Sequence, residues 1–304
     1  MYQMMSLPLY SGTFQEYDSW RDLGQELERL GCDGIEGVWG GEDLPKDLPA
    51  ELILGYHLIF YPDWLDFYRD DRAALKQKFG SLEAVASFYG GLGPDTLLEQ
   101  YRADLRRAVN LGARYVVFHV SDVSLEEGYT YRWLPTNQEV IDAAVEVVNL
   151  ILGEERWPFE FLVENQWWPG FTFTEPEETA RLLEGIRFAG KGILLDTGHL
   201  MNACTELKTE AEGADYIRSM LNRHGSLAKW VRGVHLHQSL SGAYVKAHTG
   251  SLPAGLPEDY MERFGVSYQH ILQIDQHRPW TDPAILPVLE QIEPRYLTHE
   301  LSSR

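Results

Sequence analysis

The sequence is poor in cysteine and in positive charge. The first shortage argues against a disulfide-stabilised protein, and the second against one that binds nucleic acid or membranes. Its 2 cysteines, Cys32 and Cys204, are too few for a disulfide framework, so we expect two ordinary thiols in a reducing compartment. With 26 Lys and Arg against 46 Asp and Glu, the formal net charge of -20 opposes binding to phosphate backbones and anionic membranes. We therefore predict a small-molecule substrate as the partner, and neither nucleic acid nor membrane.

Long apolar runs and linker-like segments are also missing. No uninterrupted apolar run approaches the ~18 residues that a membrane helix needs. The opening residues, MYQMMSLPLYSGTF, have neither a basic region nor an apolar segment long enough for a signal peptide. These two features predict a cytoplasmic protein. Because no Pro/Ser-rich linker or low-complexity tract interrupts the 304 residues, we interpret 1–304 as a single domain, whose oligomeric state the sequence leaves open.

What the sequence does contain is an alternation of short apolar runs with longer amphipathic stretches. Helix-type spacing follows Ser19, Gly93, Thr136 and Glu175, with Asp95 as a candidate helix cap. This alternation is typical of a parallel sheet whose strands are buried on both faces. The strand candidates are PLYSGTF from Pro8, GIEGVW from Gly34, LILGYHLIF from Leu52, RYVVFHV from Arg114, FEFLVEN from Phe159, GILLDTG from Gly192, VRGVHLH from Val231 and RYLTHE from Arg295.

Eight strand candidates fit a closed (β/α)8 TIM barrel of the α/β class. An open doubly wound sheet is the alternative, but its glycine-rich phosphate loop is missing, because Gly12 stands alone after the first run. Only four residues follow Glu300, so we expect the last helix of the barrel to be lacking. Residues 63–93, rich in aromatic side chains, and the irregular stretch 239–257 follow strands three and seven. Loops at these places usually shape a substrate pocket.

Most strand candidates end in a side chain that can bind a metal ion. The C-terminal ends of barrel strands meet at one rim, so these residues would gather there although they are distant in sequence. A mixture of imidazole and carboxylate suits zinc, manganese or cobalt, and carboxylates alone would suggest magnesium or calcium. The candidates are His57, His119, Glu164, Asp196 with His199 three residues later, His235 and His237 on one face of their strand, Glu300, and Glu36 in the second strand.

Taken singly, each of these residues also fits a structural role, because a buried histidine or acid at a strand end is often only hydrogen-bonded. We interpret Glu36 as either supporting a metal ligand from behind or lining the pocket, rather than binding metal itself. What favours a metal site is the run of Glu, Asp, His and Glu at the ends of strands five to eight, since burying such groups unpaired is expensive. The remaining histidines, His224, His270, His277 and His299, are interpreted as structural or surface groups.

With VEN at Glu164, DTGH at Asp196, VHLH at His235 and THE at Glu300, the chain resembles the xylose-isomerase-like superfamily of TIM barrels. This superfamily includes sugar isomerases and epimerases and the zinc-dependent AP endonucleases. By strand order the resemblance covers essentially the whole chain. It implies that Glu164, Asp196, His235 and Glu300 bind a catalytic divalent metal, zinc or manganese.

The AP-endonuclease branch implies further ligands. It has histidines matching His57 and His119, and a third zinc held by a histidine matching His199 and by a D-x-H element after strand seven. We assign that element to Lys246–His248, where His248 is kept and Lys246 replaces the aspartate. The sugar-epimerase branch instead implies that Glu164 and Glu300 serve as acid and base, and it has an arginine after strand seven that this chain lacks.

We rank a metal-dependent isomerase or epimerase first, acting on a sugar or polyol by proton transfer next to a carbonyl. The alternative is a multinuclear zinc hydrolase, a phosphoesterase or amidase, and a third hypothesis is a non-catalytic barrel. One metal ion per chain favours the isomerase, and two or three favour the hydrolase. The expected substrate-binding residues are His237, Lys246, Trp168 and Glu36, and the aromatic residues expected to stack on a sugar are Trp64, Tyr68, Trp133, Trp167 and Trp168.

Overall fold

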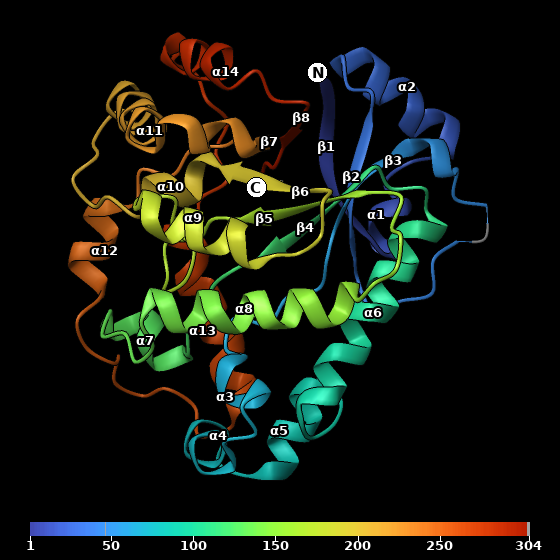
Figure 1. The fold of residues 1–304 in the computed structure, drawn as a ribbon. Helices are drawn as coiled ribbons and strands as arrows, with labels where there is room; N and C mark the ends of the chain where they lie inside the picture. The colour runs from blue at the N-terminus through green and yellow to red at the C-terminus, as the bar shows by residue number, and fades with distance from the viewer. Residues whose placement is uncertain (46, 303–304) are drawn as a thin grey trace.

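A closed barrel of eight parallel strands forms the centre of the computed structural model, which describes residues 1–45 and 47–302 (Figure 1). The strands pair in sequence order, and β1 pairs with β8 to close the barrel. The predicted TIM barrel is thereby confirmed. The strands are β1 (Tyr2–Leu9), β2 (Gly34–Trp39), β3 (Ile53–His57), β4 (Tyr115–His119), β5 (Glu160–Glu164), β6 (Lys191–Asp196), β7 (Val231–His235) and β8 (Tyr296–His299).

Helices surround the barrel and fill the connections between its strands (Figure 1). None of those in the described part of the chain combines the length and apolar character that crossing a membrane requires. The α-helices are α1 (Ser11–Phe14), α2 (Trp20–Leu30), α3 (Leu65–Tyr68), α4 (Arg72–Phe79), α5 (Leu82–Tyr89), α6 (Pro94–Asn110), α7 (Leu125–Thr130), α8 (Asn137–Leu152), α9 (Pro176–Gly185), α10 (Thr197–Asn202), α11 (Glu210–His224), α12 (Gly242–His248), α13 (Tyr260–Ile274) and α14 (Leu286–Ile292). The 3-10 helices are η1 (Ala50–Leu52), η2 (Gly225–Trp230) and η3 (Pro283–Ile285).

Local capping explains where several helices begin and end. The Ser19 hydroxyl accepts the Asp22 N–H at the start of α2, and Gly31 ends that helix with a left-handed φ of 73°. Thr136 starts α8 with a reciprocal capping box that involves Glu139. Helix α6 begins differently from the prediction, because Gly93 takes the N-cap position and Asp95 lies within the first turn.

Two other expectations about secondary structure were wrong. The first strand is Tyr2–Leu9, and the run PLYSGTF only overlaps its end before the chain enters α1. The cause is that β1 mixes polar and apolar residues, so its pattern is weaker than that of the buried strands. The stretch 239–257, expected to be irregular, contains α12. After β8, the described residues 300–302 form no helix.

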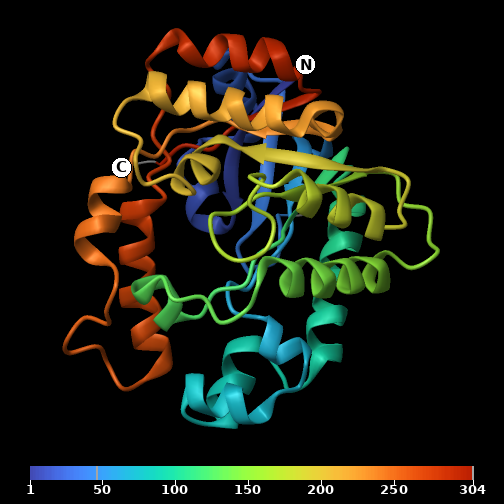
Figure 2. The same cartoon turned by 60° about the vertical axis from the view of Figure 1, so that its left-hand side comes forward.

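The long connections after β3, β4 and β7 lie together at one end of the molecule. Figures 1 and 2 both show α3, α4 and α5 on the side where α7 and α13 lie. Stacking of Phe79 in α4 on Tyr260 in α13, with ring centroids 3.8 Å apart, joins two of these insertions. The predicted insertion 63–93 is therefore a set of helices packed over the C-terminal rim of the barrel.

A buried group of charges holds the first of these insertions in place. The Asp122 carboxylate, after β4, accepts the backbone N–H groups of Trp64 and Leu65 at 2.7 and 2.8 Å. The Lys78 ammonium lies 2.7 Å from a carboxylate oxygen of Asp63. Burial, together with the negative charge of Asp63, raises the pKa of Asp122 to about 8. The folded chain thus retains a proton that an unfolded chain releases.

We expect Asp122→Asn to remove part of the pH dependence of stability. The amide keeps an oxygen acceptor, so the start of α3 stays bonded. A carboxyl whose pKa is raised on folding makes the fold less stable as pH rises toward that pKa, because the folded state binds more protons there. Relative to the wild type, the variant should gain roughly 2–3 kcal/mol in unfolding free energy between pH 6 and 9, because each pH unit below the pKa contributes about 1.4 kcal/mol.

Denaturant titrations of both proteins at several pH values measure this gain. The exposed Asp215→Asn, which removes a carboxylate paired with Arg218, is the control and should run parallel to the wild type at every pH. A constant difference between Asp122→Asn and wild type across this range would contradict the assignment.

Candidate metal centre

Three groups of histidines and carboxylates lie at the C-terminal rim, and within each group one ligand atom per residue lies within 4.8 Å of all the others. The first group is His57 from β3, His119 from β4 and Glu164 from β5. The Nε2 atoms of His57 and His119 are 3.0 Å apart, and they lie 3.2 and 3.0 Å from the same oxygen of Glu164. Three donor atoms therefore converge on one point.

The second group joins the ends of strands β5 to β8. It consists of Glu164, Asp196, His235 and Glu300, the four residues at which the sequence motifs were recognised. The Nδ1 atom of His235 is 3.0 Å from Glu300, 3.5 Å from Glu164 and 3.6 Å from Asp196. Because Glu164 belongs to the first and second groups, its carboxylate links them.

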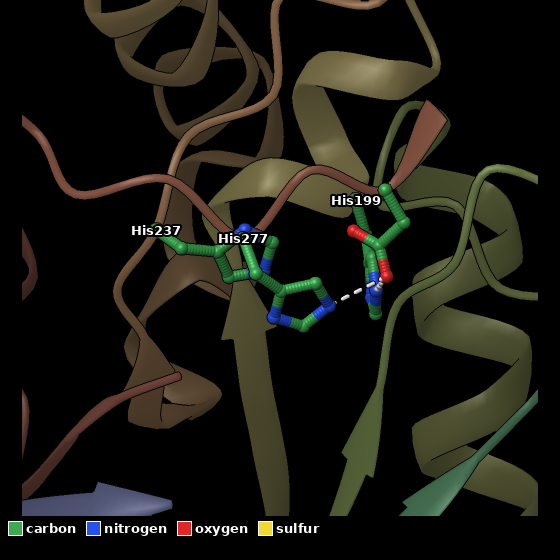
Figure 3. Close-up of side chains that lie close together, drawn as sticks. His199, His237 and His277 are labelled. Carbon is green, nitrogen blue, oxygen red and sulfur yellow. Dashed lines mark hydrogen bonds and ion pairs between the residues drawn. The ribbon is translucent and has the colours of Figure 1, made fainter. Parts of the chain in front are cut away.

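The third group consists of His199, His237, Asp275 and His277 (Figure 3). His199 and His277 each place Nε2 near one oxygen of Asp275, at 3.3 and 2.7 Å. The rings of His237 and His277 stack with centroids 4.1 Å apart. Asp275 follows the end of α13, and the backbone bonds between Gln238 and Arg278 bring this segment beside the end of β7.

The assignment of the third group's D-x-H element to Lys246–His248 is corrected by this geometry. His248 is exposed on α12, stacks on Tyr244 and belongs to none of the three groups. Lys246 is also at the surface, with its Nζ 2.7 Å from Glu206. The sequence has a true D-x-H at Asp275–His277, which the prediction missed because it placed the element in the loop directly after strand seven.

Several buried candidate ligand atoms make no good hydrogen bond to one another, and a cation would suit them better. Glu164 Oε1, His235 Nδ1 and Glu300 Oε2 are all buried, and although each lies within 3.1 Å of another candidate ligand atom, none makes a hydrogen bond of good geometry. In the third group, His237 Nδ1 and Asp275 Oδ1 are also buried without such a hydrogen bond. Buried polar atoms without good hydrogen bonds are rare, so several in one place fit a bound cation. The mixed donor set suits a divalent transition metal.

Burial and opposite charge act against each other on these groups. Burial disfavours the ionised form of Glu164, but His119 and His235 nonetheless hold the pKa of its carboxyl well below the ordinary value. The pKa of His235 is raised in spite of burial, because Glu36, Glu300 and Glu164 face it. A cation bound at these groups would compete with protons for the imidazole nitrogens, so its binding would become stronger as pH rises.

Glu36 lies beneath the second group and does not line the cavity described below. Its Oε1 accepts the Nε2–H of His235 at 2.8 Å, which leaves the other ring nitrogen, Nδ1, facing the carboxylates. Its Oε2 accepts the hydroxyls of Tyr115 and Thr298. Glu36 is fully buried, so the structure places it behind a metal-ligand candidate rather than against a substrate. Such carboxylates fix the orientation and tautomer of a ligating histidine.

We expect Glu36→Ala to weaken zinc binding by roughly 10–100-fold, the usual loss when a carboxylate that supports a ligating histidine is removed. Competition with a chromophoric chelator measures the affinity. Glu26→Ala removes an exposed carboxylate that pairs with Arg29 and serves as the control. An unchanged zinc affinity in a folded Glu36→Ala protein would show that Glu36 does not support the site.

A cavity of about 540 Å³ opens above the three groups. His57, His119, His199 and Glu300 contribute to its wall, as does Trp168, one of the predicted substrate-binding residues. The other predicted site residues do not line it; for example, His237 lies behind Asp196, bonded to it at 2.9 Å, and Glu164 is fully buried. Among the predicted stacking residues Trp167 also lines the cavity, whereas Trp64, Tyr68 and Trp133 do not.

A fold and a site of this kind define a TIM-barrel protein with three groups of candidate metal ligands at the C-terminal rim. The chain belongs to the xylose isomerase-like TIM barrel family, whose model matches residues 25–286. No curated protein matches its sequence significantly.

Several solved structures share the fold. A D-tagatose 3-epimerase-like protein is 16% identical, with 99% of this chain and 91% of that chain covered and a TM-score of 0.51. A mannonate dehydratase from Streptococcus suis serotype2 is 14% identical, with coverage of 98% and 83% and a TM-score of 0.51. Endonuclease IV from Thermus thermophilus is 16% identical, with coverage of 100% and 93% and a TM-score of 0.48. At such identities, the likeness to the epimerase-like protein and to the mannonate dehydratase establishes the fold alone.

Proposed function

We propose that this chain is a multinuclear zinc hydrolase that cleaves phosphate esters, the function ranked second from the sequence. The observation that carries the proposal is the set of three adjoining ligand groups, with Glu164 common to two of them. Proton transfer next to a carbonyl needs one cation, and a single group would provide for it. Phosphoryl transfer spreads charge over several oxygens, and multiple cations neutralise that charge.

The donor chemistry favours zinc over the alternative, manganese. Imidazoles predominate in the first and third groups, which contain His57 and His119, and His199, His237 and His277. Zinc prefers such nitrogen-rich sets with a few carboxylates, whereas manganese is more often bound by oxygen. The second group, with three carboxylates and His235, suits either metal.

In this hydrolysis, buried ligand residues hold the cations, and a residue that lines the cavity handles the proton. Bound cations would supply the positive charge that the phosphate oxygens need. Glu164, buried and shared between two groups, holds those groups at a fixed separation. Glu300 lines the cavity and takes a proton from the attacking water as the water oxygen bonds to phosphorus. The ester P–O bond then breaks, and the leaving alkoxide takes a proton from solvent to give the alcohol.

The second candidate is the isomerase or epimerase. Trp167 and Trp168, with ring centroids 4.2 Å apart, lie along the cavity wall, and aromatic faces suit sugar rings. The buried position of Glu164 argues against the epimerase, because an epimerase of the predicted kind needs both Glu164 and Glu300 to face the substrate. The exclusion of nucleic acid remains a prediction that rests on net charge.

We expect the wild type to bind three zinc ions per chain and to hydrolyse bis(p-nitrophenyl) phosphate. His277→Ala should bind one ion fewer and lose at least tenfold in kcat/KM, since it removes a ligand candidate of the third group. His248→Ala, which changes an exposed histidine outside the groups, is the matched control and should keep three ions and full activity. Elemental analysis of protein purified without chelator, and steady-state kinetics, supply the two measurements.

A different result selects one of the other functions. One ion per chain, together with solvent deuterium incorporated beside the carbonyl of a ketose, would contradict the hydrolase and establish the epimerase. Absence of turnover in both assays with fully loaded protein would leave the non-catalytic barrel.

A further inference from the structure

Aromatic side chains flank the ligand groups on two sides of the cavity. The Phe60 ring lies 4.4 Å from the ring of His119 and 5.8 Å from that of His57, measured between centroids. Across the groups, the Trp167 ring lies 5.1 Å from that of His199. The organic group of a phosphate ester bound at the rim would therefore contact these aromatic rings.

The rest of the cavity wall is also mostly apolar and carries no fixed positive charge. None of the described residues that line it is lysine or arginine. Its acids and most of its histidines belong to the ligand groups, and the remaining histidine, His270, is occupied by Tyr244 and the Gly128 carbonyl. The apolar and aromatic lining above the ligand groups includes Tyr61, Val123, Tyr129, Trp168, Phe264 and Ile271.

These features limit what a substrate can carry beyond its reacting phosphate. A second anionic group would find no cationic partner on the described walls, and burying an unpaired charge is expensive. A volume of about 540 Å³ lies in the range of cavities that take drug-sized ligands, so the space exceeds what a phosphate alone would fill. Apolar surface on the ligand would displace water from aromatic walls, which is favourable.

We infer that the substrate is a small phosphate ester of a neutral, apolar or aromatic alcohol, whose organic group lies between Phe60 and Trp167. This inference rests on the proposed function for its phosphate and on the cavity for its organic group. The hydrolysis it implies consumes one water, breaks the ester P–O bond, and releases the neutral alcohol and a phosphate product with one ester bond fewer.

Binding of non-hydrolysable phosphonates to zinc-loaded protein tests the inference apart from turnover. Phenylphosphonate, methylphosphonate and 2-carboxyethylphosphonate share one anionic head and differ in the group beyond it. Calorimetric titration should show phenylphosphonate binding at least tenfold more tightly than methylphosphonate, about 1.4 kcal/mol. The carboxyethyl compound should bind no more tightly than the methyl compound.

Substitution of Phe60 localises the preference. Phe60 is 47% exposed, so Phe60→Ala leaves the packed core intact. We expect the ratio of phenyl to methyl affinity to fall toward one in this variant. Tyr10→Ala, which removes an aromatic ring that is 41% exposed and lies outside the cavity lining, should keep the wild-type ratio.

The outcomes separate this inference from the proposed function. Equal affinities for the phenyl and methyl compounds, or no phosphonate binding at all, would overturn the inference whether or not the protein hydrolyses phosphodiesters. A phenyl preference that depends on Phe60, in a protein without phosphodiesterase activity, would support the cavity assignment and reject the hydrolase. Incision of an abasic-site duplex with a higher kcat/KM than any aryl phosphodiester would overturn the inference and leave the hydrolase standing.

Discussion

The carboxylate of Glu164 is the constraint on which the site depends. It is fully buried, and imidazoles from three different parts of the rim lie 3.0–3.2 Å from its two oxygens: those of His57, His119 and His199. A buried carboxylate is tolerated only where positive or hydrogen-bonding partners compensate the lost hydration. β3 and β4 therefore end beside β5, where His57 and His119 reach Glu164, and α10 brings His199 to the same carboxylate.

Much of the fold and of the centre could be predicted because strand geometry is regular. Parallel strands of a barrel end on one rim, so Glu164, Asp196 and His235, each the last residue of its strand, had to meet. The motif around Asp196 has a packing reason as well. A Cβ at Gly198 would collide with the His237 ring, so only glycine lets that ring approach. The strand pattern, the burial and the close contact of Gly198 with His237 all indicate that the segment around Asp196 belongs to the site.

The part that sequence reasoning missed is built by loops. Asp275 and His277 follow a helix, and only the backbone pairing of Gln238 with Arg278 brings them to the rim. No periodic pattern encodes such a long-range bridge. His277 also has a left-handed φ of 47°, a local conformation that spacing does not reveal. The D-x-H motif itself can be read in the sequence, but the sequence does not show that the motif lies at the rim of the barrel. The sequence left Glu36 with two possible roles, behind a metal ligand or against a substrate, and the 2.8 Å contact of its Oε1 with His235 Nε2 favours the first.

The spread of the ligands along the chain has a consequence for how the protein matures. His57 lies in the third strand and Glu300 follows the last one, and the barrel closes only when β8 pairs with β1. The first ligand group uses residues of β3, β4 and β5, whereas the second also needs Glu300, which follows β8. Binding of a cation by the second group would therefore depend on closure of the barrel, and so would link metal affinity to completion of the fold.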